Sequence, residues 1–273
     1  MNEEEFYIGW QDKAGVSYKS IRKKFFIFCC MLLVLFSALY LFVEKNFISS
    51  YFDYGNFTEL KGTVVEYPVF GLKTVIDDQQ VTVPLVGFGK FDANPVLSSL
   101  KQQIGGQDLS GYTITLKGTI IQYKNKRWME LTEGDNSIIS VDKSIPITQE
   151  IVDIGQRTVN GEIVDPKCFF GVMNPAYGKI HKSCAIRCIS GGIPPILAVK
   201  EGDEYIDYYF LTDQEGFKVN KEVLSVVGEP VRISGYAQSV DDWKVLKIDK
   251  EVLKSSIQTI LDDQFAICQV VQE

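Results

Sequence analysis

Residues 59–67 read ELKGTVVEY, and residues 158–165 read TVNGEIVD. Each stretch contains a glycine, one polar residue, an apolar pair and an acidic residue, as Gly62-Thr-Val-Val-Glu66 and Gly161-Glu-Ile-Val-Asp165. Short runs that are rich in β-branched residues and bounded by turn residues are typical of β-strands. Because the same strand pattern occurs twice, we expect the chain after residue 44 to contain one structural unit in two copies.

The residues after each of these strands predict the same order of elements. In the first copy a strand at 81–86, a helix at 94–105 and a hairpin of strands at 112–121 and 127–131 follow. In the second copy a strand at 205–211, a helix at 220–228 and a hairpin of strands at 230–235 and 243–248 follow. Both helices are indicated by an asparagine at the start and a glycine at the end.

The closing hairpins of the two copies correspond in detail. Apolar residues alternate before Gly118 and Gly235, and Trp128 and Trp243 occupy matching places in the final strands. Strands, a helix and a final hairpin in this order are typical of the OB-fold, a small five-stranded barrel. We therefore expect a mainly β protein with two tandem OB-like β-barrels at residues 44–150 and 151–250. Apolar residues at helical spacing predict a C-terminal helix at 251–273.

The N-terminal part of the chain contains a segment that can cross a membrane. Residues 25–43 (FFIFCCMLLVLFSALYLFV) carry no charge, and such a run is long enough to span a bilayer as a helix. A cleaved signal peptide is the alternative, but the run is long for a signal core and no small-x-small cleavage site follows. We interpret the run as an uncleaved transmembrane helix after a tail at residues 1–24.

The charges around this run predict which side of the membrane each part faces. Residues 1–24 contain five Lys and Arg, whereas only Lys45 and Lys61 lie shortly after the run. The positive-inside rule then places the N-terminus in the cytoplasm and residues 44–273 on the periplasmic or extracellular side. In such an oxidising compartment thiols persist when they are bridged, metal-bound or redox-active.

Charge and composition argue against two broad classes of function. The formal net charge is −7, whereas a nucleic-acid partner requires a basic surface. The chain has one histidine, no glycine-flanked serine and no phosphate loop, so the sequence favours a protein that is not an enzyme. The adjacent residues Asp241 and Asp242 are interpreted as exposed hairpin charges and not as an acid and base pair.

The two copies differ mainly at residues 166–195, an insertion that holds Cys168, His181, Cys184 and Cys188. A helix over 179–189 would place the histidine and the last two cysteines on one face, and Gly191-Gly192 would end it. Cys168 could close over that face as a fourth ligand. Three thiolates and one imidazole suit zinc, and sulfur ligands equally suit Cu(I) or an iron–sulfur centre. The insertion therefore predicts a metal site in the second barrel.

Two other interpretations of the same cysteines remain open. Cys168, Cys184, Cys188 and Cys268 are an even number, so disulfides could staple the insertion of a non-enzymatic protein-interaction module and leave His181 on the surface. Thiol–disulfide exchange is the other alternative, in which Lys182 and Arg187 could favour a thiolate, although solvent-facing charges on a short helix are the stronger interpretation of these two residues. Cys29 and Cys30 lie in the apolar run, where packing is the expected role.

The segments Asp165-Pro-Lys-Cys168, His181-Lys-Ser-Cys184-Ala-Ile-Arg-Cys188 and Gly191-Gly-Ile-Pro-Pro195 resemble a pattern of uncharacterised bacterial membrane-anchored cell-envelope proteins. In that pattern the cysteines and histidine lead into small OB-like β-domains. The resemblance covers the second barrel and implies a location in the envelope, but no reaction. We expect a single-pass membrane protein that binds a soft metal through the Cys3His set, for metal delivery or electron transfer beside a membrane-protein complex. No nucleic-acid partner is expected.

Overall fold

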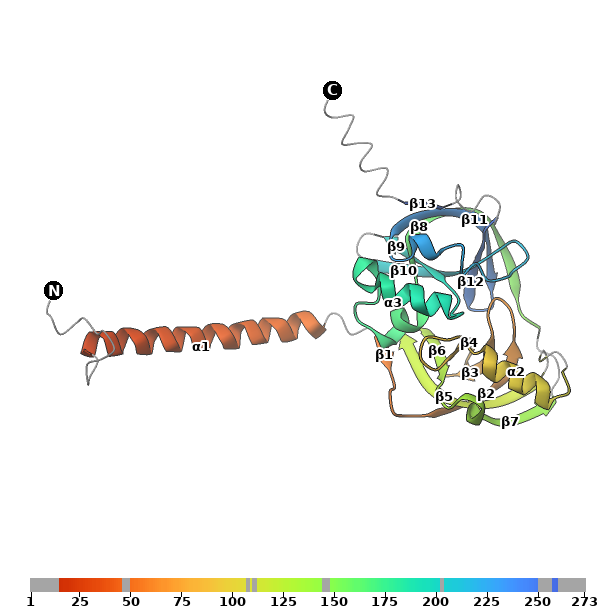
Figure 1. The fold of residues 1–273 in the computed structure, drawn as a ribbon, viewed down its shortest axis with the longest axis horizontal. Coiled ribbons are helices and arrows are strands. Elements are labelled where there is room, and N and C mark those ends of the chain that lie inside the picture. Colours follow the sequence, from red (N-terminus) through yellow and green to blue (C-terminus); the bar gives the residue numbers. More distant parts are fainter. Residues whose placement is uncertain are drawn as a thin grey trace, which may run out of the picture. The chain divides into compact units, whose positions relative to one another are not determined.

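The structure is a computed structural model that describes residues 15–45, 50–106, 109, 112–143, 148–201, 204–249 and 257–259 (Figure 1). The chain divides into two compact units, of which the first ends at Ser49 and the second begins at Ser50. All elements of the second unit except two helices and some short helical turns are strands, so the protein is mainly β.

The first unit contains the helix α1 (Val16–Lys45). Its segment Tyr18–Val43 is long and apolar enough to cross a membrane, and among the described residues it is the one helix that meets this test. A signal sequence near the N-terminus meets the same test. Its large apolar side chains are exposed, as expected for a helix that would be surrounded by lipid. The predicted apolar helix is confirmed, and its sidedness stays a prediction.

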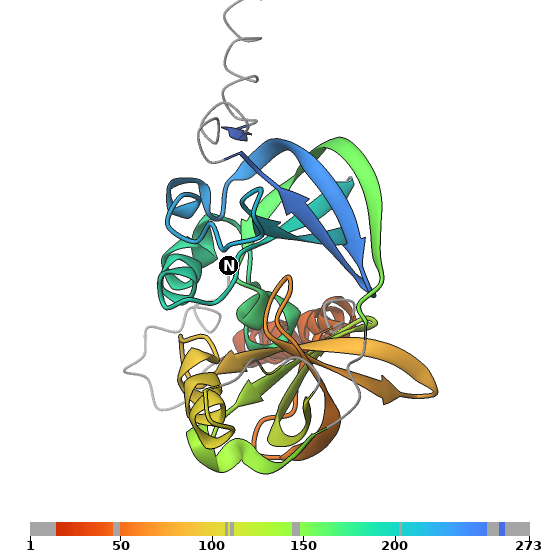
Figure 2. The same cartoon turned by 90° about the vertical axis from the view of Figure 1, so that its right-hand side faces the viewer.

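The second unit contains two closed paths of paired strands (Figure 2). The first ring consists of β2 (Thr58–Val65), β3 (Gly71–Ile76), β4 (Gln79–Gly87), β6 (Lys126–Leu131) and β5 (Tyr112–Tyr123), which returns to β2. The pairing of β4 with β6 is parallel and the others are antiparallel. The edge strands β1 (Ser50–Phe52) and β7 (Ile138–Lys143) pair with β5, and α2 (Asn94–Gln103) follows β4.

The second ring repeats this order of pairings. It consists of β8 (Ile151–Val164), β9 (Ile196–Glu201), β10 (Glu204–Thr212), β12 (Trp243–Lys247) and β11 (Pro230–Val240), which returns to β8. Again one pairing, β10 with β12, is parallel. The second ring is therefore a closed barrel of strands, and its parallel pair corresponds to the parallel pair of the first ring.

The repeated glycines of the closing hairpins have a steric reason. A side-chain methyl group at Gly118 would lie 2.5 Å from the carbonyl oxygen of Glu130, and one at Gly235 would lie 2.5 Å from that of Lys247. No side chain fits at such a distance, so the strand can approach its neighbour this closely only where a glycine stands. The correspondence seen in the sequence therefore marks the same close contact in both rings.

An aromatic core joins residues of the two rings. The ring centroids of Trp128 and Trp243 are 5.8 Å apart at a nearly perpendicular angle, and both side chains are fully buried. Phe170 packs against both tryptophans, with centroid distances of 6.0 Å. Phe170 stacks on Trp128 and meets Trp243 edge to face, and both arrangements contribute beyond the burial of apolar area. The insertion therefore supplies part of the core through Phe170.

Three details differ from the sequence predictions. Residues 220–228 form turns and the short 3₁₀ helix η4 (Leu224–Val226) instead of a longer helix, because the β-branched Val223 and Val227 are fully buried and disfavour regular helix. Residues 257–259 form the strand β13 (Ile257–Thr259) on β11, where a helix was predicted; the rest of 251–273 lies outside the described residues. The cap of α2 is Ala93, and Asn94 is its first residue.

The prediction that Asp241 is an exposed hairpin charge is also wrong. Its carboxylate lies 2.6 Å from the ammonium nitrogen of Lys73 in β3, and their side chains are 8% and 6% exposed. The neighbouring Asp242 accepts a hydrogen bond of 2.8 Å from the backbone nitrogen of Thr82 in β4. The hairpin between β11 and β12 is therefore fastened to the first ring by both carboxylates.

Candidate metal centre

The insertion begins with a helical turn that carries Cys168. After β8, the carboxylate oxygen Oδ1 of Asp165 accepts hydrogen bonds from the backbone nitrogens of Lys167, at 3.0 Å, and Cys168, at 3.5 Å. These bonds start the turn η3 (Cys168–Val172), because they satisfy donors that have no partner within the turn. The turn places Cys168 in the interior, beside the aromatic core.

The helix α3 (Gly178–Ser190) carries the other predicted ligands, as the spacing of the residues indicated. Its first backbone nitrogen, that of Gly178, donates a hydrogen bond to Glu162. Its end is held by Asn220, whose amide nitrogen donates to the carbonyl oxygens of Ile189, at 2.7 Å, and Ile193, at 2.8 Å. The predicted stop at Gly191-Gly192 is confirmed, since Gly192 has a φ of 101° that favours glycine.

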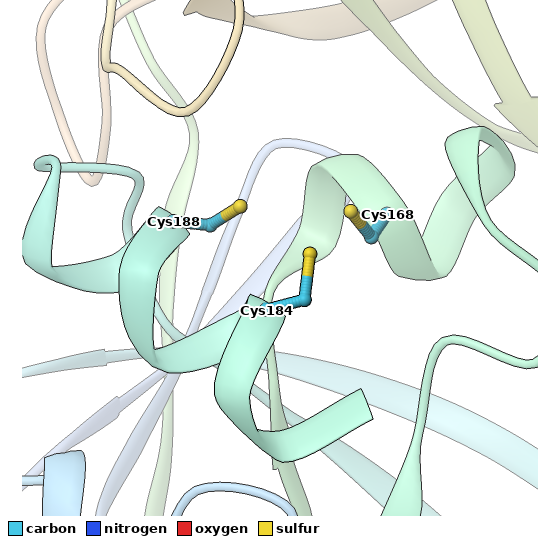
Figure 3. A group of neighbouring side chains, drawn as sticks. All are labelled: Cys168, Cys184 and Cys188. Carbon is cyan, nitrogen blue, oxygen red and sulfur yellow. The ribbon is translucent and has the colours of Figure 1, made fainter. Parts of the chain in front are cut away.

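The sulfur atoms of Cys168, Cys184 and Cys188 converge between these two helical segments (Figure 3). They all lie within 4.8 Å of one another, close enough to hold one metal ion. Cys168 and Cys188 are buried and Cys184 is partly exposed. The cysteines of the described residues, including Cys29 and Cys30 in α1, are free thiols, while Cys268 lies outside the described residues.

His181 belongs to a second group of close ligand atoms. Asp165, Cys168 and His181 each offer an atom within 4.8 Å of the others, and all three side chains are buried. The Nε2 atom of His181 lies 3.9 Å from Oδ2 of Asp165, beyond hydrogen-bond distance. The four predicted ligands therefore divide between two groups that share Cys168, and Asp165 is a member that sequence reasoning missed.

Lys90 is a further residue at the site that sequence reasoning missed. It follows β4 in the first ring, and its Nζ atom donates a hydrogen bond of 2.8 Å to Sγ of Cys184 and lies 3.9 Å from Sγ of Cys188. The hydrogen bond with Cys184 raises the pKa of Lys90 above its ordinary value. A side-chain methyl group at Gly191 would overlap the carbonyl oxygen of Lys90. A glycine at this position therefore allows the loop that carries Lys90 to approach the thiols.

A buried lysine, Lys167, and an exposed lysine, Lys218, hold this loop against the insertion. The ammonium nitrogen of Lys167 donates to the carbonyl oxygens of Gly87, at 2.9 Å, and Gly89, at 2.6 Å, and lies 3.0 Å from the carboxylate of Glu130. Lys218 forms an ion pair of 3.0 Å with Asp92. The first ring therefore contributes a fixed part of the site, whereas the sequence placed the site in the second barrel alone.

The two basic residues of α3 nearest the thiols in sequence are partly or fully exposed, in agreement with their preferred interpretation as solvent-facing charges. Lys182 forms an ion pair of 2.8 Å with Glu229, and Arg187 is exposed on α3. The basic residue that does contact a thiol is Lys90, through Cys184. No local signal could have identified Lys90, because it approaches the thiols from a distant part of the chain.

The surroundings of Cys168 keep it protonated in the absence of a cation. A hydrogen bond with Cys188, burial and the nearby carboxylate of Asp165 raise the pKa of the Cys168 thiol far above its ordinary value. A thiolate here requires a positive charge at the site, which a metal ion supplies on binding. The arrangement can therefore exchange thiol protons for a metal ion.

These features define the class of site as a cluster of free thiols beside a buried carboxylate and imidazole, which can hold a metal ion. A comparison of the chain with known protein families, curated proteins and solved structures finds no match. The function is therefore argued from the residues of this chain.

Proposed function

We propose that the protein is a single-pass membrane protein that binds a soft metal ion, Cu(I) or zinc, through Cys168, Cys184 and Cys188. The observation that carries the proposal is the convergence of these three sulfur atoms within 4.8 Å of one another. Thiolates are the ligands that soft metals prefer, and Cu(I) is stable with few ligands of this kind. Zinc would take a further ligand or a water molecule to complete its tetrahedron.

The unequal exposure of the thiols supports a role in metal delivery. Cys168 and Cys188 are buried, whereas Cys184 is partly exposed and faces the ammonium group of Lys90. A metal can pass between proteins by ligand exchange when one of its ligands is accessible to the partner. Lys90 would balance the negative charge of the thiolates and could move away when the metal enters.

The membrane attachment and the architecture belong to the same proposal. The segment Tyr18–Val43 would anchor the protein, with the second unit in the periplasm or outside the cell, beside a membrane-protein complex that gives or receives the metal. The two rings would be tandem OB-like barrels, supported by their shared order of pairings with one parallel pair each. The insertion lies after the first strand of the second ring, where OB-folds commonly bind ligands.

A second candidate function is thiol–disulfide exchange, which the contact between Lys90 and Cys184 favours. An ammonium group 2.8 Å from a partly exposed sulfur stabilises a thiolate, the nucleophile of this reaction. Cys184 would attack a disulfide of the substrate, and Cys188 would resolve the mixed disulfide, releasing the reduced substrate and leaving a Cys184–Cys188 bond. The buried Cys168 has no role in that scheme, so metal binding accounts for more of the site.

The test of metal binding uses the full-length chain, purified in detergent under anaerobic and reducing conditions. Cu(I) is added with a coloured Cu(I) chelator, and the protein is expected to withdraw one equivalent from the chelator. The single variants C184S and C188S are expected to lose this competition. A matched variant, C29S/C30S, changes cysteines of α1 outside the site and is expected to withdraw copper like the parent.

Two results would argue against metal binding. The chelator could keep all the copper, or the C29S/C30S variant could lose as much copper as C184S. Thiol–disulfide exchange would instead be supported by two results: the oxidised parent accepts electrons from a small dithiol, and the reduced C188S variant forms a mixed disulfide through Cys184 with a disulfide substrate, releasing one substrate thiol.

A further inference from the structure

The buried group of Asp165, Cys168 and His181 is not explained by a metal ion at the three thiols. Oδ2 of Asp165 and Nε2 of His181 have no hydrogen-bond partner, although their side chains are 0% and 3% exposed. Buried polar atoms are almost always paired, and a buried carboxylate oxygen without a partner is costly. The two unpaired atoms therefore need an explanation.

The carboxylate of Asp165 is held so that one oxygen remains available. Its Oδ1 atom accepts hydrogen bonds from the backbone of Lys167 and Cys168, whereas Oδ2 is directed toward His181 at 3.9 Å. The nearest buried lysine, Lys167, is not its counter-ion, because the ammonium group of Lys167 pairs with Glu130 and two backbone carbonyls. A cation bound next to Oδ2 would supply the missing positive charge.

The same group contains a sulfur that also belongs to the three-thiol cluster. Cys168 lies within 4.8 Å of Asp165 and His181 on one side and of Cys184 and Cys188 on the other. Thiolates commonly bridge two metal ions, whereas an imidazole and a carboxylate favour a divalent ion of borderline hardness such as zinc. The two groups thus differ in the metal that each suits and share one bridging ligand.

We infer that the protein has a second metal site formed by Asp165, Cys168 and His181, which takes a divalent ion such as zinc next to the soft metal ion. This inference deepens the proposed function and rests on it, because Cys168 serves as a ligand in both sites. The pair of ions forms a centre in which the thiolate of Cys168 binds both metals. The second ion has only buried protein ligands and is the resident one, while the ion at Cys184 is exchangeable.

The test uses Co(II) alone as the probe of the second site, added to the full-length chain in detergent after it has taken up Cu(I). Copper occupies the three thiols, so cobalt reports the remaining group. We expect one equivalent of Co(II) to bind, with a thiolate-to-cobalt charge-transfer absorption that identifies Cys168 as a ligand. D165N and H181Q are expected to lose Co(II) binding and to retain the one equivalent of Cu(I).

Copper binding by the two variants shows whether a loss of cobalt is caused by misfolding. D165N keeps the oxygen that caps the turn at Cys168, and H181Q leaves that turn unchanged, so retention of copper in either shows that the site is intact. C184S serves as the reverse control. It is expected to lose Cu(I) and to retain one equivalent of Co(II), because the second group does not contain Cys184.

The outcomes separate the inference from the proposed function. Copper bound without any cobalt would overturn the second site and leave the first. Cobalt that still binds in both D165N and H181Q would also overturn it. In another outcome no cobalt binds, and the affinity for copper falls in both D165N and H181Q. That result would overturn the second site and would show that Asp165 orients His181 toward a single metal. A parent chain that takes up no copper would overturn the proposed function itself.

Discussion

The ammonium nitrogen of Lys90 lies 2.8 Å from the sulfur of Cys184, although Lys90 follows a strand of the first ring and Cys184 lies in the insertion of the second. Because of this contact, residues of the first ring and of the second ring's insertion together form the site. The contact is stabilised by the loop contacts of Lys167 and Lys218, which fasten residues on either side of Lys90.

Replacement of Lys90 by methionine should slow the alkylation of Cys184. An ammonium group near a sulfur attracts a thiolate by roughly 1 kcal/mol when solvent screens the pair, which corresponds to about a fivefold lower rate without it. The rate is measured in the reduced, metal-free chain with iodoacetamide and peptide mass spectrometry. K90R should retain most of the rate, and K101M, at a partly exposed lysine of α2, should leave it unchanged. Equal rates in K90M and the parent would refute the electrostatic role of Lys90.

Removal of one member of the Lys73–Asp241 pair should destabilise the protein strongly. The side chains are 6% and 8% exposed, and an uncompensated buried charge costs about 3–5 kcal/mol. The thermal unfolding midpoint of K73M should therefore fall well below that of the parent, and K73M/D241L should recover part of the loss.

The matched control for this pair is the surface pair of Lys61 and Asp142, whose side chains are 64% and 59% exposed. K61Q should change the free energy of unfolding by less than about 1 kcal/mol, because solvent screens exposed pairs. If K61Q and K73M were equally destabilised, burial would not be the cause.

Replacement of Gly191 by alanine should disturb both stability and the thiol site. The new methyl group would overlap the carbonyl oxygen of Lys90, and overpacking of this kind costs about 1–3 kcal/mol. The unfolding midpoint should fall, and Cu(I) binding should weaken because the loop of Lys90 is displaced. S190A, at the adjacent exposed position, should behave like the parent in both measurements. A G191A chain with the parent's midpoint would contradict the close approach.

The carboxyl group of Glu162 should make stability depend on pH. Burial raises its pKa above the ordinary value of 4.5, and hydrogen bonds from Gly178 and Tyr205 only partly oppose this effect. The folded state therefore binds the proton more tightly than the unfolded state, and this contribution to stability is complete below pH 4.5 and is lost as the pH rises through the folded pKa.

The variant E162Q tests this sign, because glutamine resembles the protonated carboxyl group. The difference in unfolding midpoint, parent minus E162Q, should be more positive at pH 4 than at pH 7. Tyr205 offers a comparison at the same contact, since Y205F removes its hydroxyl group without removing the titrating carboxyl. A parent that gains stability relative to E162Q as the pH rises would show the opposite sign and contradict the effect of burial.

The sequence predicted four of the five strands of each ring, because their signal is local, and it missed β3 in the first ring and β9 in the second. The repeated pattern before Gly118 and Gly235 appears in the structure as the same close strand contact in each ring. The prediction failed at residues 220–228, where terminal asparagine and glycine suggest a helix but the buried Val223 and Val227 pack as a turn. Tertiary packing overrides weak local preferences at such positions.

The sequence by itself determined the apolar helix α1 and the single face of α3 that carries His181, Cys184 and Cys188. Both follow from the helical period, which relates residues a few positions apart. Only the tertiary structure decided that Cys168 closes over that face, that His181 is grouped with Asp165, and that Lys90 reaches Cys184. These contacts join distant parts of the chain, and their geometry depends on how the two rings and the insertion pack, which no local pattern encodes.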